Sequence, residues 1–210
     1  MSLRIFLADD HGMFREGVRL LLESQGFSVV GEAADGLTAA KLAAELHADI
    51  AVLDVAMPRL NGVDAARSLK TDAPDVKTIL LSVHTEEPYV IEGLRAGVRG
   101  YVMKTQAGSE LVQAIREVAR GAIYLSPGIS GLVVDACLTD GAHPRDPLTL
   151  RERQVLQLVA EGNSTKEVAG LLGIGARTAE SHRLRIMKKL GIHETATLVR
   201  YAVRQGLVEP

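Results

Sequence analysis

Four apolar segments in the first half of this chain each run directly into polar residues: Ile5-Phe6-Leu7-Ala8 into Asp9-Asp10, Ile50-Ala51-Val52-Leu53 into Asp54, Thr78-Ile79-Leu80-Leu81 into Ser82, and Gly100-Tyr101-Val102-Met103 into Lys104. Short apolar segments that alternate with helical patterns are typical of buried parallel strands. In such sheets, ligands bind just beyond the carboxyl ends of the strands. We therefore expect three carboxylates, one hydroxyl and one ammonium to converge at one edge of a sheet.

The pattern around these segments predicts an α/β domain over residues 1–120. Strands are expected at 4–8, 28–33, 49–53, 77–81 and 100–103, and helices at 12–25, 36–46, 62–72, 86–96 and 108–120. Five strands that alternate with five helices predict a flavodoxin-like, doubly wound, five-stranded parallel sheet, because crossovers between parallel strands are right-handed.

The remaining chain predicts a linker and a small all-α domain. Residues 121–146 are rich in Gly and Pro, which interrupt regular structure, and we expect a linker with one short helix near 129–138. Residues 147–210 are helical throughout, and the capping-box patterns at 149–152 and 164–167 open the first two helices. A Gly-containing turn at 173–175 then leads into a long helix at 176–190, which predicts a helix-turn-helix, and a last helix follows at 194–205.

Charge and composition narrow the kind of protein. Residues 1–120 hold 13 basic against 17 acidic residues, whereas residues 147–210 hold 10 basic against 6 acidic ones. A basic helical domain behind an acidic one indicates different partners, with nucleic acid a candidate for the basic domain. The apolar segments are far shorter than the roughly 18 residues of a membrane span. The lone Cys137 suits a reducing compartment, so we expect a cytoplasmic protein that does not enter a membrane.

The polar residues after the strands suit phosphoryl chemistry on a carboxylate. A carboxylate repels an anionic phosphoryl donor, and a hard cation such as Mg²⁺ relieves this repulsion by bridging the two groups. A nearby ammonium and a small hydroxyl can then bind the phosphoryl oxygens. A single Asp at a strand end is often only a helix cap or a turn residue. Four such endings in the right order make coincidence a poor explanation.

These motifs resemble the signature of bacterial response-regulator receiver domains, and residues 147–208 resemble the helix-turn-helix of the NarL/FixJ (LuxR-type) family. The matching segments are Leu7-Ala8-Asp9-Asp10-His11, Asp54-Val55-Ala56-Met57-Pro58 with Asn61-Gly62, Leu81-Ser82-Val83-His84, and Gly100-Tyr101-Val102-Met103-Lys104. The resemblance implies a DNA-binding transcriptional response regulator of a two-component system, and not an enzyme.

The resemblance also implies a role for each matching position. Asp54 would be the phosphoacceptor, and Lys104 would pair with the phosphoryl group. Mg²⁺ would be held by Asp9, Asp10, Asp54 and the backbone carbonyl of Ala56. Ser82 and Tyr101 would form a switch in which the aromatic ring moves inward, although Tyr101 could equally be an ordinary core aromatic. Two positions tune phosphoryl lifetime in the family; here they are Ala56 and His84, and we expect His84 to be inert.

The long basic helix supplies the candidate DNA contacts. Outward side chains in the N-terminal part of such a helix meet base edges, and flanking basic residues bind phosphates. We expect base contacts from Glu180, Ser181 and Leu184. The candidates for phosphate contacts are Arg177, Thr178, Arg185, Lys188 and Lys189. The recognition helix usually opens on Ser in the family, whereas Gly175 occupies that position here. Gly is a tolerable N-cap but removes a hydroxyl that could contact phosphate.

The implied partners are a sensor histidine kinase as phosphodonor, promoter DNA, and a second copy of the chain in a homodimer that forms on phosphorylation. RNA polymerase is a further candidate partner. Three other functions fit the sequence less well. An aspartyl-phosphate phosphatase would need an acid/base Asp where Ala56 stands. A small-molecule sensor would need an aromatic-lined pocket, but the chain has only four tyrosines, three phenylalanines and no tryptophan. A phosphorylation-independent regulator stays open, although the complete acidic set argues against it.

Overall fold

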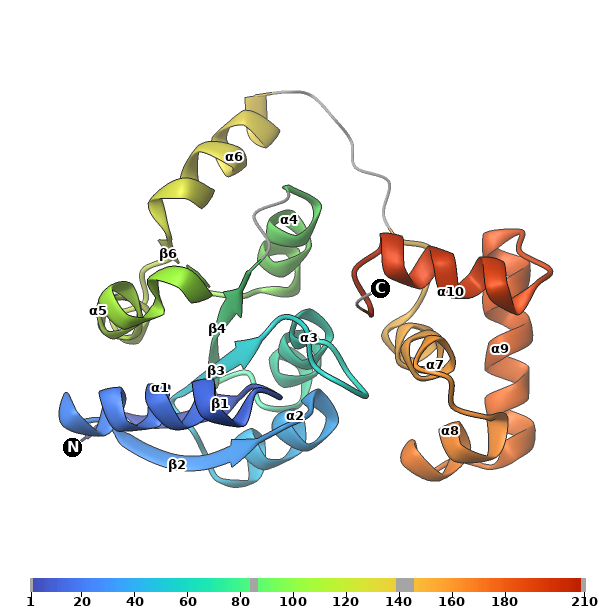
Figure 1. Ribbon diagram of the computed structural model, residues 1–210, viewed down its shortest axis with the longest axis horizontal. Coiled ribbons are helices and arrows are strands. Elements are labelled where there is room, and N and C mark those ends of the chain that lie inside the picture. Colours follow the sequence, from blue (N-terminus) through green and yellow to red (C-terminus); the bar gives the residue numbers. More distant parts are fainter. Residues whose placement is uncertain (1, 84–86, 139–145, 209–210) are drawn as a thin grey trace. The chain divides into compact units, whose positions relative to one another are not determined.

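The computed structural model describes residues 2–83, 87–138 and 146–208, and the side chains at 84–89 and 135–145 fall outside the description. The chain divides into two compact units, one built on most of residues 1–142 and the other on residues 143–210 (Figure 1). We call them the N-terminal and C-terminal units and describe each by itself.

A parallel sheet with helices on both faces forms the N-terminal unit, as predicted. Its strands are β1 (Arg4–Ala8), β2 (Ser28–Ala33), β3 (Ile50–Asp54), β4 (Lys77–Ser82), β5 (Gly100–Met103) and β6 (Tyr124–Leu125), in the order β2-β1-β3-β4-β5-β6. The helices between them are α1 (Gly12–Ser24), α2 (Gly36–Glu45), α3 (Gly62–Asp72), α4 (Glu87–Ala96) and α5 (Ala107–Ala119). The order of β1 and β3 reverses the winding beside β1, and such a reversal opens a crevice at the carboxyl ends of the strands.

All five strands predicted over residues 1–120 are present, and the sheet of the described part of the chain has a sixth strand that was not predicted. Tyr124 and Leu125 pair in parallel with Gly100 and Tyr101 of β5, inside the segment predicted to be a linker. The helix predicted near 129–138 is present as α6 (Pro127–Leu138), and it packs against α4. A strand of two residues is too short to show an apolar periodicity, so only its pairing with β5 reveals it.

Alternation along the strands divides their side chains between two cores. Ile5 and Leu7 of β1, Ile50 and Val52 of β3, and Val102 of β5 belong to one buried cluster, and α1 and α5 complete it. Successive strand residues point to opposite faces of a sheet. Residues 6, 51, 53 and 101 therefore face the other layer, which contains α2, α3 and α4 (Figure 1). This alternation fixes the direction of the polar residues that follow each strand.

The described residues of the C-terminal unit form four helices: α7 (Leu150–Ala160), α8 (Thr165–Leu171), α9 (Ala176–Leu190) and α10 (Thr195–Arg204). Both predicted capping boxes are present, with Thr149 paired to Glu152 and Ser164 paired to Glu167. A single apolar cluster joins all four helices. In α9, Ala179 and Ile186 are buried in this cluster.

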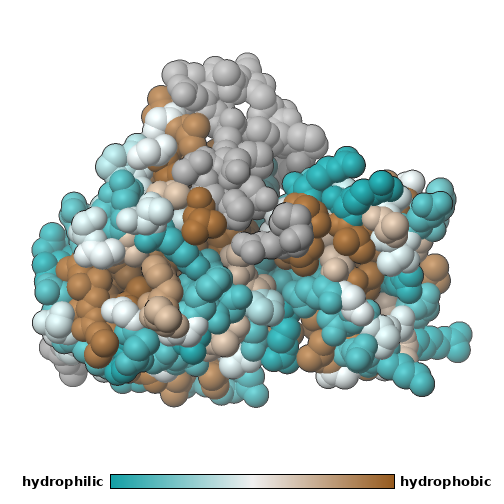
Figure 2. All heavy atoms as spheres, viewed as in Figure 1, coloured by the Kyte–Doolittle hydropathy of each residue, from teal (hydrophilic) through white to brown (hydrophobic). Residues whose placement is uncertain are grey.

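Among the described residues, no helix has the length and apolar character needed to span a membrane. Figure 2 shows a surface on which hydrophobic side chains lie among more numerous hydrophilic ones. Large hydrophobic residues with more than half of their surface exposed include Met13 and Leu20 of α1 and Leu184 of α9. Isolated exposed residues of this kind are normal and imply no site by themselves.

Gly62 begins α3 directly behind the end of β3, and its backbone N–H donates to the carbonyl of Val55 at 2.9 Å. A Cβ atom added there would lie 2.1 Å from the carbonyl oxygen of Asp54. We predict that Gly62→Ala lowers the free energy of unfolding by about 3 kcal/mol, because a backbone atom cannot give way as a flexible side chain can. Urea unfolding followed by circular dichroism measures this change.

The matched control is Gly17→Ala in α1, where nothing lies within 4 Å of an added Cβ. That substitution should raise stability by roughly 0.5–1 kcal/mol, because Ala loses less conformational freedom than Gly in a helix. Equal effects of the two substitutions would show that the contact at Gly62 is relaxed in solution.

Candidate functional site

A buried ion cluster lies at the carboxyl edge of the sheet, where the sequence predicted it. The Lys104 ammonium is 2.8 Å from Oδ2 of Asp9 and 2.8 Å from Oδ2 of Asp54. The side chains of Asp9 and Asp54 are 4% and 3% exposed, and that of Lys104 is 12% exposed. The sequence places Asp9 two residues after Leu7, Asp54 two after Val52 and Lys104 two after Val102. Asp54 lies within β3 and therefore points, like Val52, to the α1/α5 side of the sheet. Asp9 and Lys104 lie just beyond β1 and β5, and the Lys104 ammonium reaches the same side, over the Phe14 ring of α1.

Asp10 completes the acidic group at the rim. Its side chain is 35% exposed, and its Oδ1 lies 2.8 Å from Nδ1 of His11. Carboxylate or imidazole atoms of Asp9, Asp10, His11 and Asp54 all lie within 4.8 Å of one another. Hard oxygen donors packed so closely suit a divalent cation such as Mg²⁺. The donor set therefore fits the predicted ion, and His11 is a neighbour that the sequence motif contained without a role.

Burial dominates the proton affinity of Asp54. It raises the pKa of Asp54 from 3.8 to about 6, opposed by the hydrogen bond from Lys104 and increased by the charge of Asp9. The backbone N–H of Ala56 also donates to this carboxylate and lowers its pKa. For Lys104, burial disfavours the ammonium, but Asp54 and Asp9 outweigh that effect and raise its pKa. Lys104 thus keeps its proton, whereas burial makes the ionised form of Asp54 less favourable than it is in water.

The predicted switch pair lies on the other side of the sheet. Ser82 follows Leu81 and Tyr101 precedes Val102, so both have the opposite alternation to the ion cluster. Ser82 is 1% exposed and Tyr101 is fully buried. A Cβ added at Gly93 of α4 would lie 3.8 Å from the Tyr101 ring, which places the ring beside that helix. A buried ring fits both an inward switch position and an ordinary core aromatic. His84 lies outside the described residues.

Phe14 and Arg15 of α1 border the cluster, and the sequence analysis did not predict either of them as a site residue. The Lys104 ammonium lies 5.1 Å from the centre of the Phe14 ring, a cation–π distance. The Arg15 guanidinium donates to the backbone carbonyl of Asp9 at 2.5 Å. Neither residue stands at a strand end, and no motif marked them. Only the packing of α1 against β1 brings them to the site.

The predicted DNA-contacting residues all lie on or at the start of α9, but they do not share one environment. Arg177, Thr178, Leu184, Arg185 and Lys188 are exposed. Glu180 is half-buried and accepts a hydrogen bond of 3.1 Å from the Thr165 hydroxyl. Ser181 donates to the carbonyl of Arg177 at 2.8 Å. Gly175 is the N-cap of α9, as predicted, without a side-chain cap.

Lys189 has a partner within its own unit. Its ammonium is 2.6 Å from Oε2 of Glu152, whose side chain is 5% exposed, and 3.2 Å from the carbonyl of Pro147. Burial works against the Glu152 carboxylate, but hydrogen bonds from Lys189 and Thr149 lower its pKa. The sequence assigned Lys189 to DNA phosphates. The contact joins α9 to α7, and the role of Lys189 at DNA phosphates stays a prediction, since the residue is also exposed.

A doubly wound domain with a buried Asp–Lys–Asp cluster at its carboxyl edge, followed by a helix-turn-helix unit, defines the class of receiver-controlled DNA-binding regulators. Two family matches agree with this class. Residues 5–116 match the response regulator receiver domain, and residues 146–202 match the bacterial regulatory proteins of the luxR family. The chain belongs to the LuxR-type response regulators, which are transcription regulators and not enzymes.

Relatives match the chain over its full length. It is 35% identical over 208 residues to the transcriptional regulatory protein MctR of Rhizobium johnstonii, covering 99% of this chain and 96% of that protein. It is 34% identical over 210 residues to the response regulator GacA of Pseudomonas aeruginosa, covering 99% and 98%. Among solved structures, the RcsB–DNA complex has a TM-score of 0.60 at 25% identity, covering 96% of this chain and 98% of that one.

The raised pKa of Asp54 predicts a stability gain on its neutralisation. The folded state holds the proton up to about pH 6, whereas the unfolded chain releases it near 3.8, so stability falls as pH rises through this window. We predict that Asp54→Asn raises the free energy of unfolding by about 1–3 kcal/mol at pH 8 and by much less at pH 4. Urea unfolding in EDTA at both pH values measures the difference.

Asp35→Asn is the control, because Asp35 caps α2 through the Thr38 backbone N–H and Asn caps helices about as well as Asp. Its effect should be small at either pH. A gain at Asp54 of the same size at pH 4 and pH 8 would contradict the proposed desolvation of this carboxylate.

Proposed function

We propose that Asp54 accepts a phosphoryl group and that this event controls DNA binding by the C-terminal unit. The observation that carries the proposal is the Lys104 ammonium, 2.8 Å from both Asp54 and Asp9, whose side chains are almost fully buried. A carboxylate oxygen of Asp54 forms the new bond to phosphorus, and the bond from phosphorus to the donor's leaving group breaks. Lys104 is close enough to turn from the carboxylate to the added phosphoryl oxygens.

Asp9, Asp10 and Asp54, with the backbone carbonyl of Ala56, would hold the divalent cation. Mg²⁺ in this position supplies charge neutralisation between the acceptor carboxylate and the incoming phosphoryl group. The three carboxylates outnumber the single ammonium, so the pocket retains negative charge and favours a cation. Burial of Asp9 and Asp54 strengthens these electrostatic interactions relative to exposed groups.

Ser82 and Tyr101 would carry the signal to the opposite face of the sheet. Ser82 is the last residue of β4, which pairs with β3, and Asp54 is the last residue of β3. A phosphoryl oxygen on Asp54 would accept a hydrogen bond from the Ser82 hydroxyl. Tyr101 lies beside Gly93 of α4, so a shift of Ser82 and Tyr101 would change how α4 packs. A local change of charge would thus bias an element with two arrangements.

The exposed part of α9 is the proposed DNA-binding surface, with bases met by its N-terminal half and phosphates by the flanking basic residues. The RcsB–DNA complex is a relative bound to DNA, and a further structure is described as two RcsB dimers on two parallel DNAs. By extension, we infer that this chain binds promoter DNA as a homodimer after phosphorylation by a sensor histidine kinase. RNA polymerase would be its partner at the promoter, and the cytoplasm, which holds the chromosome, its place of action.

Phosphorylation is tested with acetyl phosphate and Mg²⁺ on the full chain. We predict one adduct of about 80 Da, the mass of one phosphoryl group, detected by intact mass spectrometry and absent from Asp54→Ala. Light scattering with beryllofluoride and Mg²⁺ should show a Mg²⁺-dependent dimer for the wild type only. If DNA binding were intact without any adduct or dimer, the regulator would be phosphorylation-independent instead.

Lys188 and Lys189 form a matched pair for the DNA-binding surface. Lys188→Met should weaken binding to a mixed-sequence duplex and reduce the salt slope by about one unit, since it would remove one phosphate contact. Lys189→Met should instead lower the stability of the C-terminal unit by about 1–2 kcal/mol, because Glu152 loses its cation. Fluorescence anisotropy against salt and thermal unfolding separate the two effects. Identical behaviour of the variants would contradict the assignment of separate roles.

A further inference from the structure

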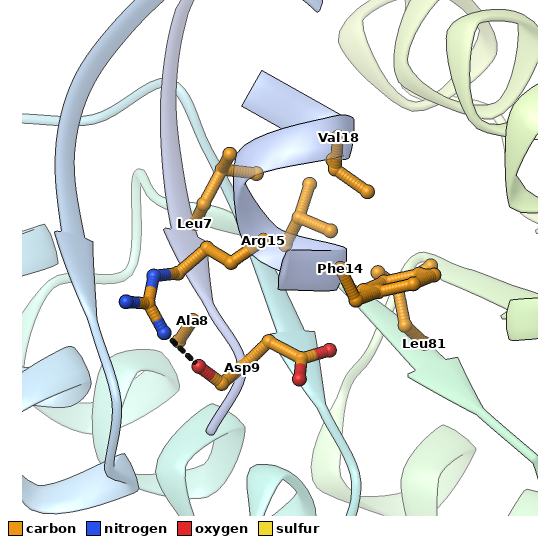
Figure 3. A pocket seen from close by; sticks show the side chains of 8 residues that line it. Leu7, Ala8, Asp9, Phe14, Arg15, Val18 and Leu81 are labelled. Carbon is orange, nitrogen blue, oxygen red and sulfur yellow. Dashed lines mark hydrogen bonds between the residues drawn. The ribbon is translucent and has the colours of Figure 1, made fainter. Parts of the chain in front are cut away.

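Arg15 in the first turn of α1 reaches back to the end of β1. Its Nη1 donates to the backbone carbonyl of Asp9 at 2.5 Å, and its Nε donates to Oε2 of Glu32 in β2 at 2.9 Å. Figure 3 shows the guanidinium on one side of Asp9 and the Asp9 carboxylate pointing away from it on the other. The side chains of Arg15 and Glu32 are 22% and 32% exposed, so this is a partly buried arrangement.

The contact to the carbonyl completes the fixing of Asp9. The Asp9 backbone N–H donates to the carbonyl of Ala33 at 3.2 Å, and Oδ1 accepts the His11 backbone N–H at 2.9 Å. Oδ2 lies 2.8 Å from the Lys104 ammonium. With the Arg15 contact, the backbone N–H, the backbone carbonyl and both carboxylate oxygens of Asp9 are each held by a different part of the unit.

Holding the Asp9 carbonyl also orients Asp10. The carbonyl and the N–H of Asp10 belong to one planar peptide group, so fixing one end of the plane restricts the other. Asp10 is the more exposed of the two carboxylates, and the described structure gives its side chain a contact only with exposed His11. Its position therefore depends on the backbone before it more than on contacts of its own carboxylate.

Arg suits this task better than Lys. The planar guanidinium offers donors in a fixed fork, and here two of them bind a carbonyl and a carboxylate on neighbouring strands. An ammonium at the end of a flexible chain lacks that fixed geometry. Arg15 thereby joins β2 to the end of β1 at the edge where the acidic residues gather.

We propose that Arg15 is a positioning residue of the acidic pocket: by holding the Asp9–Asp10 peptide group, it sets the carboxylates in the arrangement that binds the divalent cation. The proposal rests on the proposed function, because it concerns the cation of that site. Groups that orient metal ligands without touching the metal commonly change metal affinity by roughly 10- to 100-fold.

The sign of the effect distinguishes positioning from simple electrostatics. Removing a positive charge beside an acidic pocket should strengthen cation binding if charge alone matters. Removing the residue that orients the ligands should weaken it. Arg15→Met therefore gives opposite results under the two explanations, and a merely structural ion pair gives no change in affinity.

The experiment is a Mg²⁺ titration of the full chain, followed through the amide chemical shifts of the pocket, for the wild type, Arg15→Met, Arg15→Lys and Arg19→Met. Arg19 is the matched control: it lies one turn further along α1 and ion-pairs with Glu16, Glu23 and Glu32. We expect about tenfold weaker binding in Arg15→Met, an intermediate value in Arg15→Lys, and the wild-type value in Arg19→Met. Unchanged or tighter binding in Arg15→Met would overturn the proposal, as would an equal loss in Arg19→Met.

Glu32→Gln serves if Arg15→Met does not fold. It keeps the guanidinium and its bond to the Asp9 carbonyl but weakens the second anchor, and it should reduce affinity by a smaller factor. Wild-type affinity in Glu32→Gln would then overturn the proposal.

The wild-type chain separates a failure of the proposed function from a failure of the role of Arg15. If it binds no Mg²⁺, the proposed function fails and this inference with it. If it binds Mg²⁺ and gains the Asp54 adduct while Arg15→Met binds equally well, only the role of Arg15 fails.

Discussion

The Lys104 ammonium between Asp9 and Asp54 is the interaction on which the N-terminal unit depends. Two carboxylates with almost no exposure would repel each other, and each would lose its hydration. The two 2.8 Å contacts of Lys104 offset much of that cost, yet burial still leaves the pKa of Asp54 at about 6. The Asp54 carboxylate therefore keeps an unfavourable desolvation energy in the folded state. In such a pocket, binding of a cation or a phosphoryl group changes the electrostatic energy strongly.

The alternation of strand residues places the charged site and the proposed switch on opposite sides of the sheet. Asp54 and Lys104 point towards α1 and α5, whereas Ser82 and Tyr101 point to the layer of α4. Lys104 comes three residues after Tyr101 at the end of β5, and Ser82 ends β4 beside β3, whose last residue is Asp54. A shift of register by one residue would exchange the faces and destroy both the pocket and the buried aromatic. The same pairing that builds the core thus keeps the charged site and the proposed switch adjacent but on opposite sides.

The sequence predicted the features that depend on residues close together in the chain. Strand and helix boundaries followed from apolar periodicity and capping boxes, and the acidic pocket followed from the residues after each strand. The sequence could not reveal β6, because two residues show no period and β5 supplies the pairing. Nor could it reveal Arg15, whose role depends on a carbonyl and on Glu32, 17 residues away. The contact of Lys189 with Glu152 was hidden for the same reason, because the two residues are 37 positions apart.

The position of Lys189 also limits how the basic charge of α9 can be used. Its ammonium holds the buried carboxylate of the capping box that starts α7, so part of the positive charge at the end of α9 is already neutralised within the unit. The exposed Arg177 and Thr178 lie at the opposite end of the helix, where the macrodipole is positive and attracts phosphate. Exposed basic side chains lie at both ends of α9, with Arg177 near its start and Arg185 and Lys188 in its C-terminal half. At the start of the helix the N-cap Gly175 contributes no hydroxyl, so contacts to phosphate there must come from side chains and backbone N–H groups.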